Sequence, residues 1–142
     1  MSYLASKGTS IEELTKQYTG RKFGELVLYH QKLKSYEELS LAVDGLRDKI
    51  HPKLKDTTEE FLKTIEYGFA KSKILWETDC GKTLKVYITS TKAEAKKFDL
   101  EVDDDYTFDI FNLIVLTLAA RASVDPVFKK FIEKSIRKFW IF

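Results

Sequence analysis

Few side chains in this 142-residue chain are of the types that perform nucleophilic or metal chemistry. His30 and His51 are the only histidines, and Cys80 is the only cysteine. A single cysteine forms neither an intrachain disulfide nor a cysteine-based metal cage. The histidine spacing gives no metal-binding pattern, so we expect His30 at the edge of the core and His51 at a helix end. Cys80 is expected in an exposed turn without a nearby histidine to activate it. The sequence therefore predicts no catalytic residue, no metal and no cofactor.

Two further patterns suggest chemistry. Arg47 and His51 lie four residues apart on one predicted helix face. This pair resembles the arginine–histidine pair of HEPN ribonucleases, although its spacing is shorter, and a hydrolase or nuclease is therefore our third functional class. The tripeptide 81–83 (Gly-Lys-Thr) matches the end of a Walker A loop, but Trp76 occupies the position of the required first glycine. Nucleotide binding by a Walker A loop is thus excluded.

An acidic segment covers residues 99–109, which include six acids and no base. Because the formal net charge is +2, the rest of the chain carries +8. The segment lacks the glycine and glutamate positions of a calcium-binding EF-hand loop. Aspartates just before a helix also stabilise its positive end. We interpret the segment as a helix cap, and an acidic patch for a basic partner is the alternative.

Two basic regions are candidates for binding anions or nucleic acid. The segment 20–24 joins two predicted helices and includes the cations Arg21 and Lys22. At the start of the second helix, these side chains lie near free backbone N–H groups and the positive end of the helix dipole, which together favour an anion. The last predicted helix has a basic face with interleaved aromatic residues, which is typical of helices that bind nucleic acid, membranes or partner grooves. Its basic residues are Lys129, Lys130, Lys134, Arg137 and Lys138.

The sequence closes with three large apolar residues, 140–142. Burial of such side chains is worth about 1.5–3 kcal/mol each, so we expect them to be covered. Either the tail docks on the core of its own chain, which is the commoner arrangement, or Trp140 and Phe142 bind a partner.

Helix starts are marked by capping patterns. A capping box places serine or threonine before a helix and glutamate three residues later. The candidate starts are Ser10 with Glu13, Ser35 with Glu38, Thr91 with Glu94, Asp56 with Glu59, Asp104 or Asp105, and Asp125 before Pro126. Apolar spacing then predicts helices over about 11–18, 23–33, 36–50, 57–69, 105–121 and 126–139. Residues 110–118 are apolar nearly all round and predict the buried centre of a bundle.

Residues 73–89 instead alternate apolar and polar side chains on both sides of the glycine-containing segment 79–82. This alternation predicts a β-hairpin. The expected fold is therefore mainly α, a bundle of five to six helices with one small hairpin, in a single domain that spans residues 1–142.

Composition narrows the functional class. With 44% hydrophobic and 32% charged residues the chain is typical of a globular protein. The longest apolar run is shorter than a membrane span and no secretory signal is apparent, so we expect a cytoplasmic protein. One asparagine, two glutamines and abundant lysine and glutamate are also typical of hyperthermophile proteins. The favoured function is a non-enzymatic interaction subunit of an intracellular multi-protein assembly. The alternative is an RNA- or DNA-binding small subunit of a ribonucleoprotein complex.

Overall fold

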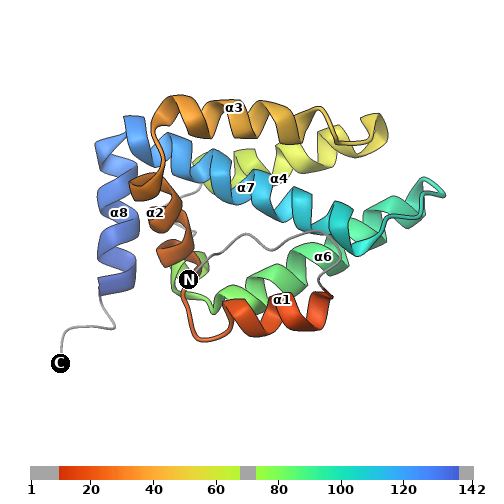
Figure 1. The fold of residues 1–142 in the computed structure, drawn as a ribbon, viewed down its shortest axis with the longest axis horizontal. Coiled ribbons are helices and arrows are strands. Elements are labelled where there is room, and N and C mark those ends of the chain that lie inside the picture. Colours follow the sequence, from red (N-terminus) through yellow and green to blue (C-terminus); the bar gives the residue numbers. More distant parts are fainter. Residues whose placement is uncertain (1–9, 68–72, 138–142) are drawn as a thin grey trace.

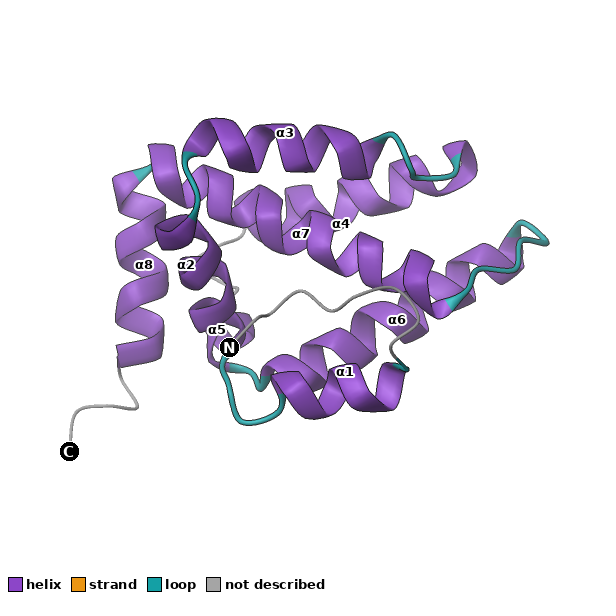
Figure 2. Ribbon diagram, in the orientation of Figure 1, coloured by secondary structure: helices purple, strands orange, loops and turns teal. Residues whose placement is uncertain are grey.

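The computed structural model describes residues 10–67 and 73–137, and over these ranges the chain is all α-helical (Figure 2). The described residues form eight α-helices and one short 3-10 helix, with no strand among them. In chain order these are α1 (Ile11–Tyr18), α2 (Phe23–Leu33), α3 (Tyr36–Arg47), η1 (Pro52–Leu54), α4 (Lys55–Tyr67), α5 (Lys73–Glu77), α6 (Cys80–Lys97), α7 (Asp104–Val124) and α8 (Pro126–Arg137).

Helix α7 is the centre of the bundle. It packs against α2, α3, α6 and α8, and α3 runs antiparallel to it along one side (Figure 1). Within residues 110–118 only Asn112 and Thr117 are partly exposed, so the prediction of a buried central helix is confirmed. The helix is also long and apolar enough to cross a membrane, but 67% of that apolar window is buried inside the fold. Core helices of bundles have the same composition.

Aromatic rings connect the other helices to this centre. Phe111 of α7 contacts Tyr18 of α1 and Phe23 of α2 at ring centroid distances of 6.0 and 6.1 Å. The chain of contacts continues through Trp76 of α5, which stacks on Phe23 and meets Phe128 of α8 edge-on at 5.7 Å. Short helices are marginal alone, so this cluster stabilises α5, which has only five residues.

Three predicted caps are confirmed. At the start of α8, which begins at Pro126, the Asp125 carboxylate accepts a hydrogen bond from the Phe128 backbone N–H at 3.1 Å. Ser35 and Glu38 form the complete reciprocal capping box of α3. The Ser10 hydroxyl accepts a hydrogen bond from the Glu13 backbone N–H at the start of α1. Gly20 follows α1 with a φ of +89°, a left-handed conformation that glycine adopts without strain, and the chain turns there into α2.

The predicted hairpin over residues 73–89 is wrong, because this segment forms α5 and the first half of α6. The buried residues of α6 follow helical spacing, Leu84, Tyr87 with Ile88, then Thr91. Val86, an apolar residue of the alternating pattern, is 61% exposed. The segment 79–82 is a helix start: the Asp79 carboxylate accepts hydrogen bonds from the backbone N–H groups of Gly81 and Lys82.

Other predicted boundaries also differ. The predicted five to six helices become eight in the described residues, since the hairpin is replaced by two helices. Thr91 is buried inside α6 and starts no helix. Asp56 lies in the first turn of α4, which continues directly from η1. The α7 cap is Asp103, whose carboxylate accepts from the Tyr106 N–H at 2.8 Å.

Candidate functional site

Cys80 is buried at the start of α6, not exposed in a turn as predicted. Burial raises the pKa of its thiol to about 12, and the nearby carboxylates of Asp79 and Glu25 act in the same direction. A thiol with this pKa carries almost no thiolate near neutral pH, and the thiolate is the reactive form. Cys80 is therefore a core residue in this fold.

The two histidines do not form a joint site. His30 is buried on α2, and burial together with the charge of Lys34 lowers its pKa to about 4. The His51 ring accepts a hydrogen bond from the Lys53 backbone N–H through Nδ1. Within the described residues, no group of three histidine, cysteine or acidic side chains could hold a metal ion.

Arg47 and His51 do not share a cavity. The Arg47 guanidinium forms an ion pair with Glu59 at 3.4 Å and lines a cavity between α3 and α7. His51 lines a separate cavity beside residues 100–106. The paired action that a hydrolase or nuclease would need is not supported by this placement.

Two aspartates of the acidic segment 99–109 cap a helix or pair with a lysine. Asp103 caps α7, and Asp104 accepts a hydrogen bond from the Lys92 ammonium at 2.8 Å. These contacts agree with the interpretation of the segment as a helix cap.

Two backbone N–H groups of the loop before α2 already donate hydrogen bonds within the chain. The Gly20 N–H donates to the Asp79 carboxylate at 2.7 Å, and the Phe23 N–H donates to the Thr78 carbonyl. A carboxylate of the chain itself thus occupies part of the predicted anion position. Anion binding at this loop would therefore depend on the side chains of Arg21 and Lys22.

The two predicted basic regions lie next to each other. The Lys22 ammonium donates to the Ile136 carbonyl at the end of α8, at 3.4 Å. Lys130 and Lys134 are exposed on α8. Lys129 lines a cavity of about 460 Å³ between α2 and α8, together with Lys32, which the sequence analysis did not single out. Arg137 is the last residue of α8, whereas Lys138, Trp140 and Phe142 lie outside the described residues.

A mainly apolar groove lies between α4, α5 and α6. Its volume is about 410 Å³. Its lining residues are Phe61, Thr64, Ile65, Leu75, Thr78, Lys82, Thr83, Val86 and Tyr87. Two of these lining residues, Phe61 and Tyr87, meet edge to face at 5.7 Å. This groove was not predicted from the sequence, because residues 73–89, which form α5 and the first half of α6, were interpreted as a hairpin.

Comparison of the chain with protein-family models, with curated proteins and with solved structures gave no match.

Proposed function

We propose that this chain is a non-enzymatic interaction subunit of an intracellular multi-protein assembly, and that it binds an amphipathic helix of a partner in the α4–α5–α6 groove. The observation that carries the proposal is the apolar groove itself. Helix-binding grooves of proteins are lined by apolar side chains and take apolar residues spaced one helical turn apart.

Exposed apolar side chains at the groove support this function. Val86 belongs to its lining and is 61% exposed, and Ile74, next to the lining residue Leu75, is 76% exposed. Large apolar side chains next to an apolar groove are typical of protein-interaction sites. A partner helix that covered Val86 would remove this apolar surface from water.

A positive charge at the edge of the groove indicates which charges the partner helix should carry. Lys82 lines the groove one helical turn before Val86, and Lys85 is exposed on the same helix. Among the groove-lining residues Lys82 is the charged one. Complementary potentials favour association, so the expected partner helix carries apolar residues on one face and acidic residues beside them.

The test compares two lysine substitutions of equal charge. Val86→Lys places a cation in the groove, and Val127→Lys places one at the start of α8, where Val127 is 69% exposed. Tagged wild type and both variants are used for quantitative affinity purification from the source cells. A photo-crosslinker in place of Val86 then identifies the contacting segment, which is synthesised and titrated against each variant.

The proposal expects a crosslinked acidic amphipathic helix whose affinity falls at least about tenfold in Val86→Lys. Val127→Lys should retain the wild-type affinity. Equal retention of every bound protein by both variants would contradict the proposed groove.

A second candidate function is binding of RNA or DNA, and the contact of Lys22 with the end of α8 favours it. This contact brings Lys22 next to the end of the basic helix α8. Charge reversal of Arg21 and Lys22 should weaken binding to single-stranded RNA similarly for all sequences, since phosphate contacts carry no base information. The log–log salt slope should fall by about 1 for each contact removed. Absence of wild-type RNA binding at ~50 mM salt excludes this function.

A further inference from the structure

The turn between α6 and α7 combines exposed acids with an exposed aromatic ring. It covers residues 98–103, which include three acids and no base, and we call these residues the acidic tip. Phe98 is 40% exposed, and Asp99 and Glu101 are exposed beside it. The acidic tip therefore presents an apolar side chain flanked by negative charge.

The acidic tip is held in a defined conformation by its own contacts. The backbone N–H groups of Asp99 and Leu100 donate to carbonyls in the last turn of α6 at 3.1 and 2.9 Å. The Asp103 side chain caps α7, and Leu100 and Val102 pack partly against the core. Because the tip is already ordered, its binding to another surface would cost little conformational entropy.

The acidic tip and the α4–α5–α6 groove have complementary properties. The groove is mainly apolar, and Val86 is exposed in its lining. Lys82 also lines the groove, and Lys85 is exposed on the same helix. Burial of an aromatic ring in an apolar groove favours association, and opposite charges favour the matching partner. The tip has the acidic and apolar character that the groove calls for.

The acidic tip can reach this groove only on another copy of the chain. Lys82 and Phe98 are 16 residues apart, which corresponds to about 24 Å along the axis of α6. Figure 2 shows α5 at one end of α6 and the α6–α7 turn at the other. Two copies with antiparallel α6 helices would place each tip at the groove of the other copy. Such a contact is the same in both directions and closes as a dimer.

We propose that a second copy of this chain occupies the groove, so that two copies exchange their acidic tips in a symmetric dimer. Phe98 of each copy lies against the apolar lining of the other groove, and Glu101 lies opposite Lys82. A partner helix would compete with the second copy. The inference rests on the groove of the proposed function but requires no other protein, so measurements on the purified chain alone separate the two.

A charge swap tests this contact by sedimentation velocity of the purified chain at low salt, from ~1 µM to ~1 mM. Lys82→Glu and Glu101→Lys each place like charges at both contacts of the dimer. Each variant alone should therefore raise the dimer dissociation constant at least about tenfold. An equimolar mixture of the two variants restores opposite charges at both contacts, and it should form a dimer with nearly the wild-type dissociation constant.

Matched variants separate this contact from general effects of charge. Lys130→Glu makes the same charge change on α8, where Lys130 is exposed, and should leave the dissociation constant unchanged. Val86→Lys places a cation in the apolar contact and should raise the dissociation constant at least about tenfold, whereas Val127→Lys should not. Circular dichroism of each monomer checks that the fold is retained.

Three results would overturn the dimer. One is a wild-type chain that stays monomeric at ~1 mM. Another is an equal effect of Lys82→Glu and Lys130→Glu, which would show that the groove lysine has no specific partner. The third is a mixture of Lys82→Glu and Glu101→Lys that stays monomeric, which would exclude the exchange of tips. A protein crosslinked at Val86 in the presence of any of these results would leave the proposed function in place.

Discussion

Asp79 joins two loops and starts a helix, so its replacement by alanine should destabilise the whole fold. One carboxylate oxygen accepts from the N–H groups of Gly81 and Lys82 at 2.9 and 3.3 Å, which caps α6. The other accepts from the Gly20 N–H at 2.7 Å, between α1 and α2. The side chain thus acts on two segments that are 59 residues apart in sequence.

The magnitude follows from these contacts. Loss of an N-cap costs about 0.5–2 kcal/mol. A hydrogen bond to a charged group contributes about 1.5–3 kcal/mol, and the lower end applies because water reaches the Gly20 N–H. We therefore expect Asp79→Ala to lower the free energy of unfolding by about 2–3 kcal/mol. Asp79→Asn keeps an equally good cap and loses only charge, so it should cost about 1 kcal/mol or less.

Urea denaturation followed by circular dichroism measures this effect. With a slope of about 2 kcal/mol/M, the midpoint of Asp79→Ala should fall by about 1–1.5 M. Asp48→Ala is the matched control, because Asp48 is exposed at the end of α3, and it should change stability by less than about 0.5 kcal/mol. A loss below about 1 kcal/mol in Asp79→Ala would refute the capped-helix account and fit an exposed hairpin turn.

Three other predictions concern single residues of the helices. Gly24→Ala should destabilise the protein by about 1–3 kcal/mol, since the new Cβ would lie 2.8 Å from the Ile136 side chain; Gly45→Ala, with no atom within 4 Å, should instead stabilise it by about 0.5–1 kcal/mol in urea titrations. Cys80 should resist iodoacetamide at pH 8 in the folded protein and react in urea, as mass spectrometry would detect, because burial raises its pKa to about 12. The pKa of His30 is about 4 in the folded protein and 6.5 in the unfolded chain. The neutral buried ring therefore contributes fully to the free energy of unfolding above pH 6.5, and up to about 3 kcal/mol is lost as the pH falls toward 4. His30→Gln should flatten this part of a plot of urea midpoint against pH.

Local sequence signals were sufficient where the interacting groups are close along the chain. The Ser35–Glu38 capping box forms within one helical turn, so its residue types alone placed the start of α3. The apolar run 110–118 identified the buried helix because a helix that is apolar on every side has no face left for water. The mainly α class follows from such signals, whereas the hairpin predicted over residues 73–89 was wrong.

The segment 73–89 required tertiary information. Its alternating pattern fits a strand, and a short apolar run does not separate the two structures by periodicity. The helical state is stabilised by partners distant in sequence: Trp76 packs on Phe23 and Phe128, and Asp79 binds the loop at Gly20. These contacts exist only once α2 and α8 are in place.

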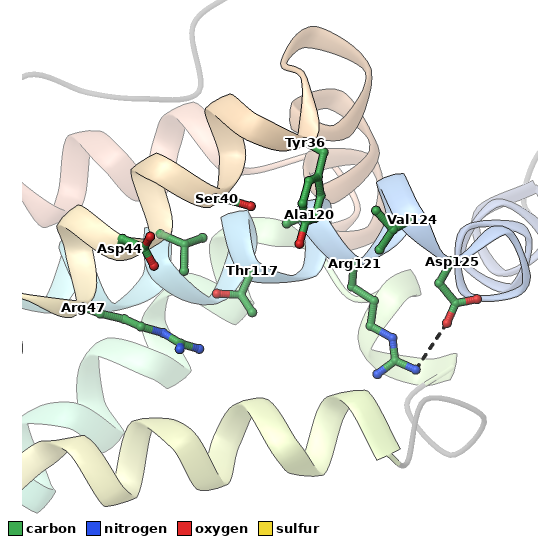
Figure 3. Close-up of a pocket in the computed structure, with 10 residues that line it drawn as sticks. Tyr36, Ser40, Asp44, Arg47, Thr117, Ala120, Arg121, Val124 and Asp125 are labelled. Atoms are coloured by element: carbon green, nitrogen blue, oxygen red, sulfur yellow. Dashed lines mark hydrogen bonds and ion pairs between the residues drawn. The ribbon is translucent and has the colours of Figure 1, made fainter.

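The candidate sites divide in the same way. Basic residues of α8 were recognisable from charge pattern and helical period, because both are properties of one contiguous segment. The groove combines residues of α4, α5 and α6, and the cavity between α3 and α7 (Figure 3) combines Arg47 with Thr117 and Arg121, some 70 residues later. Sequence alone determined which faces of the helices are apolar or charged. Only the packing of the helices against one another decided which of those side chains meet, because contacts between helices depend on how the whole core fills its volume.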